Sequence, residues 1–202
     1  DFYASSYNVN FADSETGKAM GKWISENTNG TLSPEIKTDS EQILSIINTV
    51  YFHDQWINRF DKDKTLEDTF YLLDGKEARI DFMNKTLGSA GFAKEKDFTR
   101  SSLGLKNGGQ MIFILPHQGV SPYELLSSPD EIERIFEEGE DDYGEVVWKI
   151  PKFSFDSKFK LKNYLKELGI KEAFNPNADF TGITDNMAYI SNIQQETYIS
   201  ID

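Results

Sequence analysis

The sequence predicts an α+β fold, in which strands and helices of irregular length are mixed without a repeated strand–helix unit. The pattern of the segments supports this class, and the composition supports a single packed domain. Segments in which apolar and polar residues alternate, typical of half-buried strands, are scattered between helix-like segments. The hydrophobic fraction is 38% and the aromatic fraction is 13%, so the 202 residues can bury a core and form one domain.

The first quarter of the chain predicts a strand, a helix and a second strand. Ser6–Phe11 alternates like a half-buried strand. A helix capped by Asp13 or Ser14 follows and ends at Asn29-Gly30, with one apolar stripe made of Ala19, Met20, Trp23 and Ile24. Ile43–Phe52 is almost continuously apolar and β-branched, which is typical of a central strand covered on both faces.

Two hairpins are predicted next. Thr69–Met83 turns at Asp74-Gly75, a favoured two-residue turn. A second hairpin joins Ser102–Lys106 to Met111–Leu115 through a turn that contains two glycines.

A helix over Pro122–Phe136 and an acidic loop over Glu137–Asp142 follow the hairpins. Gly144–Phe155 predicts a strand, and because Pro151 cannot donate to a sheet ladder, this strand must have an edge, a bulge or a switch of sheet there. A helix over Ser157–Leu168 is then predicted, ended by Gly169, with five apolar residues facing inward: Phe159, Leu161, Tyr164, Leu165 and Leu168.

The last segment, Ile190–Asp202, alternates like a strand. No turn residue or charged tail ends this pattern, and we therefore expect the chain to be a piece of a longer protein.

Charge and composition exclude several classes of function. The net charge is −13 and the isoelectric point is about 4.6, which argues against nucleic acid or an anionic membrane as the main partner. The chain has no cysteine, hence no disulfide framework and no thiol nucleophile. No catalytic or nucleotide-binding motif is present, and His53 and His117 are isolated. We therefore expect no enzyme activity, no cofactor and no metal.

Two polar intrusions interrupt the apolar strands: Asn48, within Ile43–Phe52, and Gln194-Gln195, within the last strand. One interpretation is that each side chain satisfies a backbone group at a sheet edge. The other is that they form a hydrogen-bonded seam between neighbouring strands, one that can part. Propensity does not separate the two.

At these residues the chain resembles the serpin family. Six ordered segments spanning nearly the whole chain carry the resemblance: Met20–Gly30, Ile47–Phe60, Thr65 to Phe70 with Met83, Leu115–Gly119, Ile150–Phe153 and Leu168–Ile183. The resemblance implies a single, incomplete serpin domain over 1–202. Its fold would be a partial serpin fold, with a large mixed sheet that contains Ile43–Phe52 and Ile190–Asp202, hairpins of smaller sheets, and the Ser14–Thr28 helix packed across a sheet face through Trp23.

The resemblance also implies a function. Serpins trap serine or cysteine proteases: an exposed loop is cleaved and inserts as a new strand into the main sheet, carrying the acylated protease with it. By position, Asn48 and Gln195 would be the latch of the shutter, where the central strands part. Trp56, Thr65 and Lys152 would line the breach, where the loop enters.

The departures from the family pattern limit what this chain does alone. Gly21 stands where the family has a helical Asn, and Gln195 stands where it has a shutter histidine. The hinge and the reactive loop would follow Asp202, so this chain alone is expected to inhibit nothing, to self-associate, or to need a complementary chain.

The alternative is a non-inhibitory serpin acting as a chaperone, carrier or storage protein, which the hinge residues would discriminate. We expect an extracellular, secreted or cell-surface protein of bacterial type, with a cytoplasmic location as the alternative.

Overall fold

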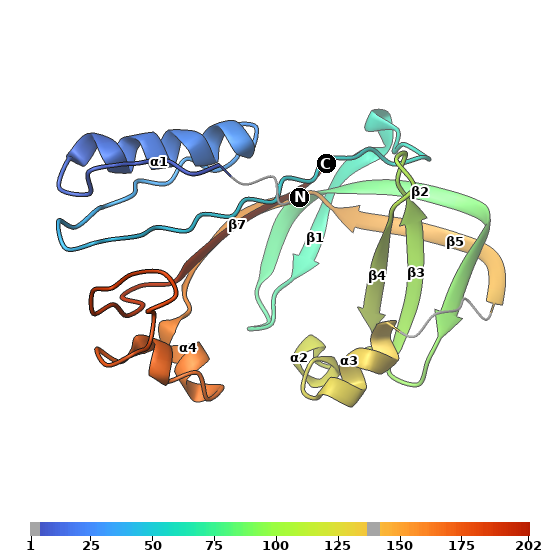
Figure 1. Cartoon of the computed structure of the whole chain (residues 1–202). Coiled ribbons are helices and arrows are strands. Elements are labelled where there is room, and N and C mark those ends of the chain that lie inside the picture. The colour runs from blue at the N-terminus through green and yellow to red at the C-terminus, as the bar shows by residue number, and fades with distance from the viewer. Residues whose placement is uncertain (1–4, 137–141) are drawn as a thin grey trace. The chain divides into compact units, whose positions relative to one another are not determined.

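The computed structural model describes residues 5–136 and 142–202, and its mixture of helices and antiparallel sheets confirms the α+β class (Figure 1). The chain divides into two compact units. The first comprises Asp1–Phe52 and Ser154–Ser200, and the second comprises His53–Phe153 and Ile201–Asp202.

Helix α1 (Ser14–Asn27) begins where the sequence predicts. The carboxylate of Asp13 accepts a hydrogen bond from the backbone N–H of Glu15 at 2.9 Å and so caps the helix. The helix ends before Asn29 and Gly30, whose φ angles are 50° and 77°, a left-handed conformation that stops helical hydrogen bonding.

The buried face of α1 differs from the predicted stripe. Ala19 is exposed, and Met20 and Trp23 are half-buried. The buried residues are Thr16, Gly17, Gly21 and Ile24. The helix turns its glycines inward because the backbone of residues 34–36 lies directly against them: a Cβ at Gly17 would be 2.1 Å from the carbonyl oxygen of Ile36. Trp23, which was expected to dock α1 on a sheet face, is only half-buried.

The strands predicted at Ser6–Phe11 and Ile43–Phe52 are wrong for the described residues: neither segment belongs to a sheet. Ile43–Phe52 carries strongly exposed side chains, with Ile46 83% and Val50 85% exposed. The large mixed sheet expected to contain Ile43–Phe52 is therefore absent from the described part of the chain. Apolar patterning records a preference for burial, but a strand forms only where a neighbouring strand pairs with its backbone groups.

The rest of the first unit contains a two-stranded sheet and a small helical region. Strand β6 (Phe153–Lys160) pairs with β7 (Gln194–Ile201), so the last strand is confirmed but is shorter than predicted. The two strands enclose helix α4 (Lys162–Glu167) and the short 3-10 helix η2 (Glu172–Phe174) in the sequence.

Helix α4 is also shorter than the predicted Ser157–Leu168 helix, because residues 157–160 continue strand β6. Phe159, Tyr164 and Leu168 were expected to face inward but are 48%, 58% and 80% exposed. Gly169, with φ 98°, ends the helix as predicted.

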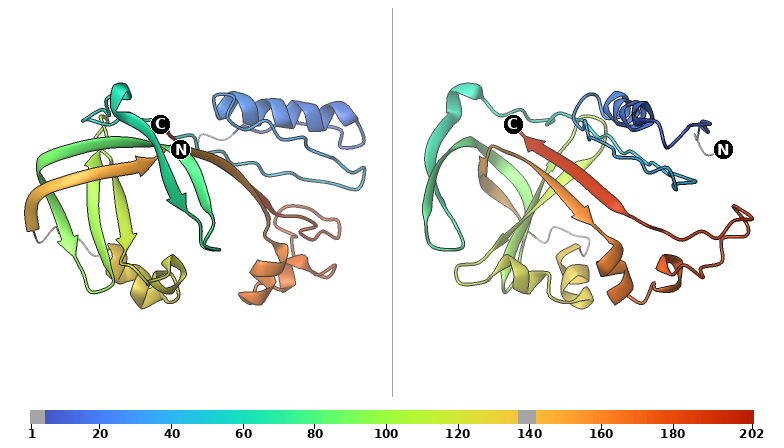
Figure 2. Two further views of the ribbon diagram at one scale, coloured as in Figure 1. Left: turned by 180° about the vertical axis from the view of Figure 1, so that it is seen from behind. Right: turned by 90° about the vertical axis from the view of Figure 1, so that its left-hand side faces the viewer.

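The second unit is built on a five-stranded sheet, seen from two sides in Figure 2. Its strands pair in the order β1–β2–β3–β4, and β5 pairs with the long strand β2. All four ladders are antiparallel. The strands are β1 (Thr65–Tyr71), β2 (Glu77–Lys94), β3 (Phe98–Gly104), β4 (Gln110–Pro116) and β5 (Asp142–Pro151), and the 3-10 helix η1 (Lys62–Lys64) precedes β1.

Both predicted hairpins are confirmed. Gly75, with φ 80°, lies in the turn between β1 and β2, and Gly108, with φ 92°, lies in the turn between β3 and β4. The predicted interruption at Pro151 is a switch of sheet, since β5 ends at Pro151 in the second unit and β6 starts at Phe153 and pairs with β7.

The helix predicted over Pro122–Phe136 is split into α2 (Pro122–Leu125) and α3 (Pro129–Phe136). Pro129 disfavours helical geometry at the preceding residue, and the Ser128 hydroxyl accepts a hydrogen bond from the backbone N–H of Glu131 at 3.2 Å, which starts a new helix. The predicted acidic loop, Glu137–Asp142, lies outside the described residues except for Asp142, which begins β5.

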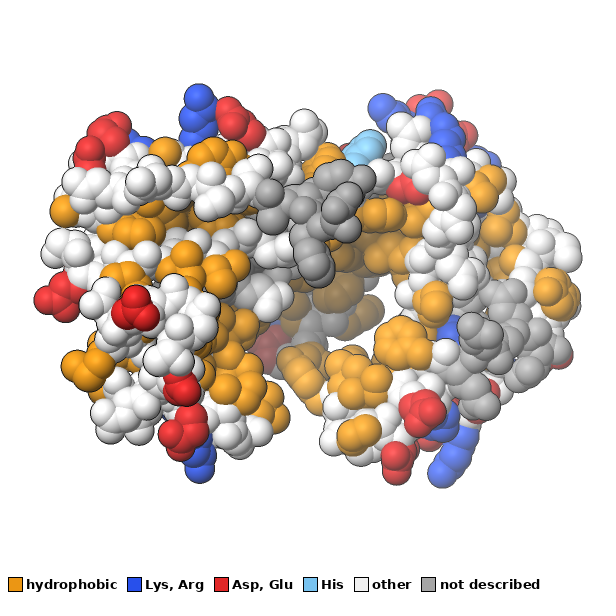
Figure 3. All heavy atoms as spheres, in the orientation of Figure 1, with side chains coloured by type: hydrophobic (Ala, Val, Ile, Leu, Met, Phe, Trp, Pro, Cys, Tyr) orange, Lys and Arg blue, Asp and Glu red, His pale blue; other side chains and the backbone are white. Residues whose placement is uncertain are grey.

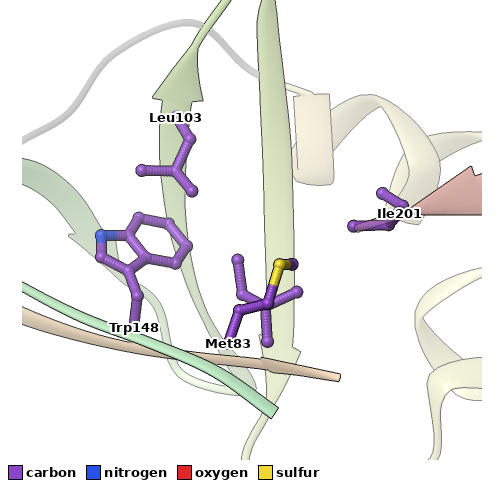
Figure 4. Close-up of a cluster of buried hydrophobic side chains, with 5 residues drawn as sticks. Met83, Leu103, Trp148 and Ile201 are labelled. Atoms are coloured by element: carbon purple, nitrogen blue, oxygen red, sulfur yellow. The ribbon is translucent and has the colours of Figure 1, made fainter. Parts of the chain in front are cut away.

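The second unit has two apolar clusters. The larger consists of Met83, Leu103, Trp148, Ile150 and Ile201, and the side chains labelled in Figure 4 come from four different strands. The smaller joins Phe98 of β3 to Leu125 of α2 and Ile135 of α3, so the two helices cover one end of the β3–β4 hairpin. Strand β2 and the strands that pair with it, β1, β3 and β5, therefore form a packed platform.

Candidate functional site

The three residues assigned to the breach lie around one stretch of β2, Asp81–Met83. Thr65 opens β1 and pairs directly with Met83. Lys152, between β5 and β6, donates its backbone N–H to the carbonyl oxygen of Asp81 at 2.8 Å. Trp56 packs against the cluster that contains Met83. The structure therefore brings Lys152 to the same stretch of β2 as Trp56 and Thr65, which lie far from it in the sequence.

Trp56 is held by both backbone and ring contacts. It forms an isolated β-bridge with Leu105, and its ring centroid lies 6.1 Å from that of Phe60 and 6.2 Å from that of Phe113. Phe113 in turn lies edge-on to Trp148, with ring centroids 5.2 Å apart. Such aromatic contacts add stability beyond the burial of area and restrict the ring of Trp56.

The start of β1 is fixed by side-chain contacts. The amide of Asn84 donates to the carbonyl oxygen of Lys64 at 2.9 Å, just before Thr65. Strand β2 also pairs with β5 here: Met83, the partner of Thr65, pairs with Ile150, and Asn84 pairs with Lys149. The side chain of Lys152 is exposed, so its charge is available at the surface while its backbone is anchored.

The two residues assigned to the shutter are placed differently. Asn48 and Gln195 are both exposed, and within the described residues neither side chain makes a hydrogen bond. The neighbouring Gln194 donates to the carboxylate of Glu196 at 2.9 Å. The latch between the two residues stays a prediction.

Strand β7 leaves one edge unpaired. Within the described residues it pairs with β6 alone, and Ile43–Phe52, in the same unit, is extended but joins no sheet. An unpaired edge presents a row of backbone donors and acceptors, which is a template for an additional strand. The first unit therefore offers two segments with unfilled backbone hydrogen-bonding capacity.

Large apolar side chains are exposed in both units, and Figure 3 shows hydrophobic side chains at many places on the visible face. In the second unit they include Leu66, Tyr71 and Leu73 of the β1–β2 hairpin, which are 61%, 71% and 76% exposed. Large exposed apolar surface marks a region that another segment or molecule covers.

Among the described residues, His117 and Asp61 each make contacts that hold the local backbone in place. His117 is held in place by the backbone carbonyl of Lys96, 3.0 Å from its Nδ1, and by the hydroxyl of Thr99, 3.2 Å from its Nε2. No group of three or more histidine, aspartate or glutamate side chains in the described ranges could hold a metal ion. The carboxylate of Asp61 accepts a hydrogen bond from the backbone N–H of Asp63 and caps the helix η1. In the described part of the chain, no helix combines the length and apolar character needed to cross a membrane.

An ion pair links three strands of the second unit. Lys149 of β5 bonds to the carboxylate of Asp68 in β1, across β2. This hydrogen bond, with a second from the backbone N–H of Thr69, holds the pKa of Asp68 below its usual value. The pair is half-exposed and contributes orientation more than stability.

Two features escaped the sequence analysis. The close approach at Gly17 and Gly21 is signalled by their spacing of four residues on one helix face, but Gly21 was noted only as a departure from the family pattern. The second is a group of lysines around Phe174, which a local count of charges would have found.

Comparison with known sequences supports the resemblance over the whole chain. The family model described as Serpin (serine protease inhibitor) matches residues 1–202. A mouse protein named as a serine protease inhibitor is 30% identical over 84% of this chain and 41% of its own length. An uncharacterized serpin-like protein of Methanosarcina acetivorans is 31% identical over 90% of this chain and 44% of its own length. The chain thus spans less than half the length of these relatives.

Solved structures show the same fold. The thermophilic serpin tengpin in its latent state is similar with a TM-score of 0.77 and 21% identity, over 97% of this chain and 54% of that one. The native state of tengpin gives a TM-score of 0.72 over 93% of this chain and 50% of that one. The six matched segments, the family model over residues 1–202 and the shared fold agree. The chain therefore belongs to the serpin family.

Proposed function

We propose that the full-length protein containing this chain inhibits a serine protease by loop insertion and covalent trapping, and that it is not an enzyme. In this mechanism the catalytic serine of the protease attacks a peptide bond of an exposed loop, so that an ester to the loop forms while the peptide bond breaks and its amine end leaves. The loop then inserts as a strand and carries the protease along before water can hydrolyse the ester. Family membership supports the class of function.

The observation that carries the proposal is the edge of β7 that pairs with no strand in residues 5–136 and 142–202. A strand that enters here gains the backbone hydrogen bonds that β7 does not make with β6, and Ile43–Phe52 supplies a second extended segment in the same unit. Pairing of unfilled donors and acceptors gives the insertion its driving force. Asn48 and Gln195, both exposed in these two segments, are then the polar groups that an inserted strand would contact first.

The platform around Asp81–Met83 has a different role in the proposal. Trp56 and Thr65 are held by packing and by strand pairing, so they form a fixed surface rather than a moving one. Lys152 is the single residue between β5, which belongs to this platform, and β6, which pairs with β7. These residues would guide the entering loop without themselves reacting.

The proposal is tested by mixing the full-length protein with trypsin-like, chymotrypsin-like and subtilisin-like proteases and by running the products on denaturing gels. We expect at least one protease to give a covalent complex that survives SDS. A protease whose catalytic serine is replaced by alanine is the control, and it should give no such band because no acyl bond can form. If every active protease digests or ignores the protein while its loop is exposed, the non-inhibitory alternative replaces this proposal.

The contribution of the seam is tested with Gln195→Ala, for which Gln194→Ala is a neighbouring control on the same strand. We expect Gln195→Ala to change the number of inhibitor molecules consumed per protease trapped, because this number reports the race between insertion and deacylation. Gln194→Ala should leave it unchanged. Equal behaviour of the two variants would remove Gln195 from the mechanism.

A further inference from the structure

A local excess of positive charge stands out in this strongly acidic chain. Residues 158–171 carry five lysines and one glutamate, whereas the whole chain has 34 acidic and 21 basic residues. The excess lies over the end of β6, helix α4 and the turn that precedes η2. It is therefore concentrated on one small part of the first unit.

Lysines from this segment gather around one aromatic ring. The ammonium groups of Lys162 and Lys166 lie 5.8 and 5.9 Å from the centroid of Phe174, which is 5% exposed. Lys162 and Lys166 are four residues apart on α4, so their charges share one helix face and repel each other. The ring partly compensates this repulsion through its negative face.

A hollow lies beside the ring. It has a volume of about 420 Å³ and is lined by Lys166, Lys171, Phe174, Asn175 and Pro176. The side-chain oxygen of Asn175 already accepts a hydrogen bond from the backbone N–H of Asn177 at 3.0 Å. The amide NH₂ of Asn175 makes no hydrogen bond within the described residues and adds a neutral donor to the two lysines.

These lysines are not engaged with carboxylates. In the described ranges, Lys158 pairs with Glu196, but no ion pair involves Lys162, Lys166 or Lys171. In the part of the chain that the structure describes, the nearest acidic residues in the sequence, Glu167 and Glu172, form no ion pair with them either. Lys162 also donates a hydrogen bond to the carbonyl oxygen of Ser191 at 3.3 Å.

We propose that Lys162, Lys166 and Lys171, with Phe174 and Asn175, form a binding site for a tetrahedral oxyanion, a phosphate or sulfate group carried by a ligand. An ammonium group is a point charge that binds such anions without a fixed angle, and three of them suit an anion that carries more than one charge. Bound there, the anion would relieve the repulsion between the lysines. The apolar wall of Phe174 would strengthen the attraction by lowering the local dielectric constant.

The test is calorimetric titration of the full-length protein with two probes, sodium pyrophosphate and sucrose octasulfate, at low salt. We expect saturable binding that weakens as NaCl is added, because salt screens exposed charges. Binding of both probes would assign the shared oxyanion chemistry, and binding of one would assign phosphate or sulfate as the source. Absence of binding by both would overturn the proposal.

A triple variant tests the location. Lys162→Gln, Lys166→Gln and Lys171→Gln together should weaken binding about thirtyfold, that is about threefold for each exposed ion pair lost. The matched control replaces Lys18, Lys22 and Lys76 with Gln, which removes the same charge from lysines that already pair with Glu15, Glu26 and Asp74. Both variants should keep the circular dichroism spectrum of the parent. Equal loss in the two variants, or no loss in the first, would show that binding does not occur at Phe174.

Discussion

Replacement of Gly17 by alanine should destabilise the protein, although alanine is the better helix former. In an open helix position the change would raise the free energy of unfolding by about 1 kcal/mol. Here the added Cβ would lie 2.1 Å from the carbonyl oxygen of Ile36 and 3.2 Å from its carbonyl carbon. The clash is with backbone, so it cannot be relieved by rotating a side chain.

The magnitude follows from these two opposing effects. An ordinary contact distance needs a displacement of roughly 1 Å between α1 and residues 34–38, and overpacking of this kind costs about 1–3 kcal/mol. After subtraction of the propensity gain, we expect a net loss of up to about 2 kcal/mol. Gly21→Ala should cost less, since its Cβ would lie 2.5 Å from the oxygen of Pro34.

Urea denaturation of the full-length protein measures this loss as a shift of the midpoint at constant slope. The matched control is Gly88→Ala, at a position where a Cβ would meet no atom within 4 Å. The expected order of stability is Gly88→Ala above Gly21→Ala above Gly17→Ala. A Gly17→Ala protein that is more stable than the parent would show that α1 does not rest on residues 34–38.

Three further outcomes follow from the structure. The hydrogen bond from Lys149 lowers the folded-state pKa of Asp68, so the Lys149–Asp68 pair stabilises the fold above the unfolded pKa of about 4, and this stabilisation is lost as the pH falls through the folded pKa. The melting temperatures of the parent and Asp68→Asn proteins should therefore differ at pH 6 and converge in acid. Met83→Ala, at a 3% exposed core position, should cost about 2–5 kcal/mol in urea denaturation, and a loss below about 1 kcal/mol would remove Met83 from the core. Residues 1–202 expressed alone should block no protease and should sediment as an associated species, because Ile46, Val50 and Leu73 are each more than three-quarters exposed; a monodisperse monomer that blocks a protease stoichiometrically would contradict this.

The local chemistry of turns and caps could be predicted from the sequence because it depends on neighbouring residues. Asp13 caps α1, Gly75 and Gly108 occupy left-handed turn positions, and Pro151 ends a strand, as the residue types require. The family motifs were also legible, since they are fixed in order along the chain, and the three residues assigned from them, Trp56, Thr65 and Lys152, lie around Asp81–Met83.

What could not be predicted depends on distant partners. Ile43–Phe52 has strand-like composition but joins no sheet in the described residues, and a sequence pattern does not say whether a neighbour is present. The inward face of α1 was predicted only in part: Ile24 is buried as expected, whereas close backbone contact selects Gly17 and Gly21 for the rest of that face. The predicted inward face of α4 was wrong as well: β6 takes residues 157–160, and Tyr164 and Leu168 are exposed.

Hydrogen exchange of the full-length protein before and after loop cleavage by a trapped protease tests the central claim most directly. If the loop inserts beside β7, backbone amides in residues 194–201 and 43–52 should exchange markedly more slowly in the cleaved complex, while the β1–β2 hairpin should be unchanged. Unchanged exchange in both segments, in a sample with a verified covalent complex, would contradict insertion at this edge.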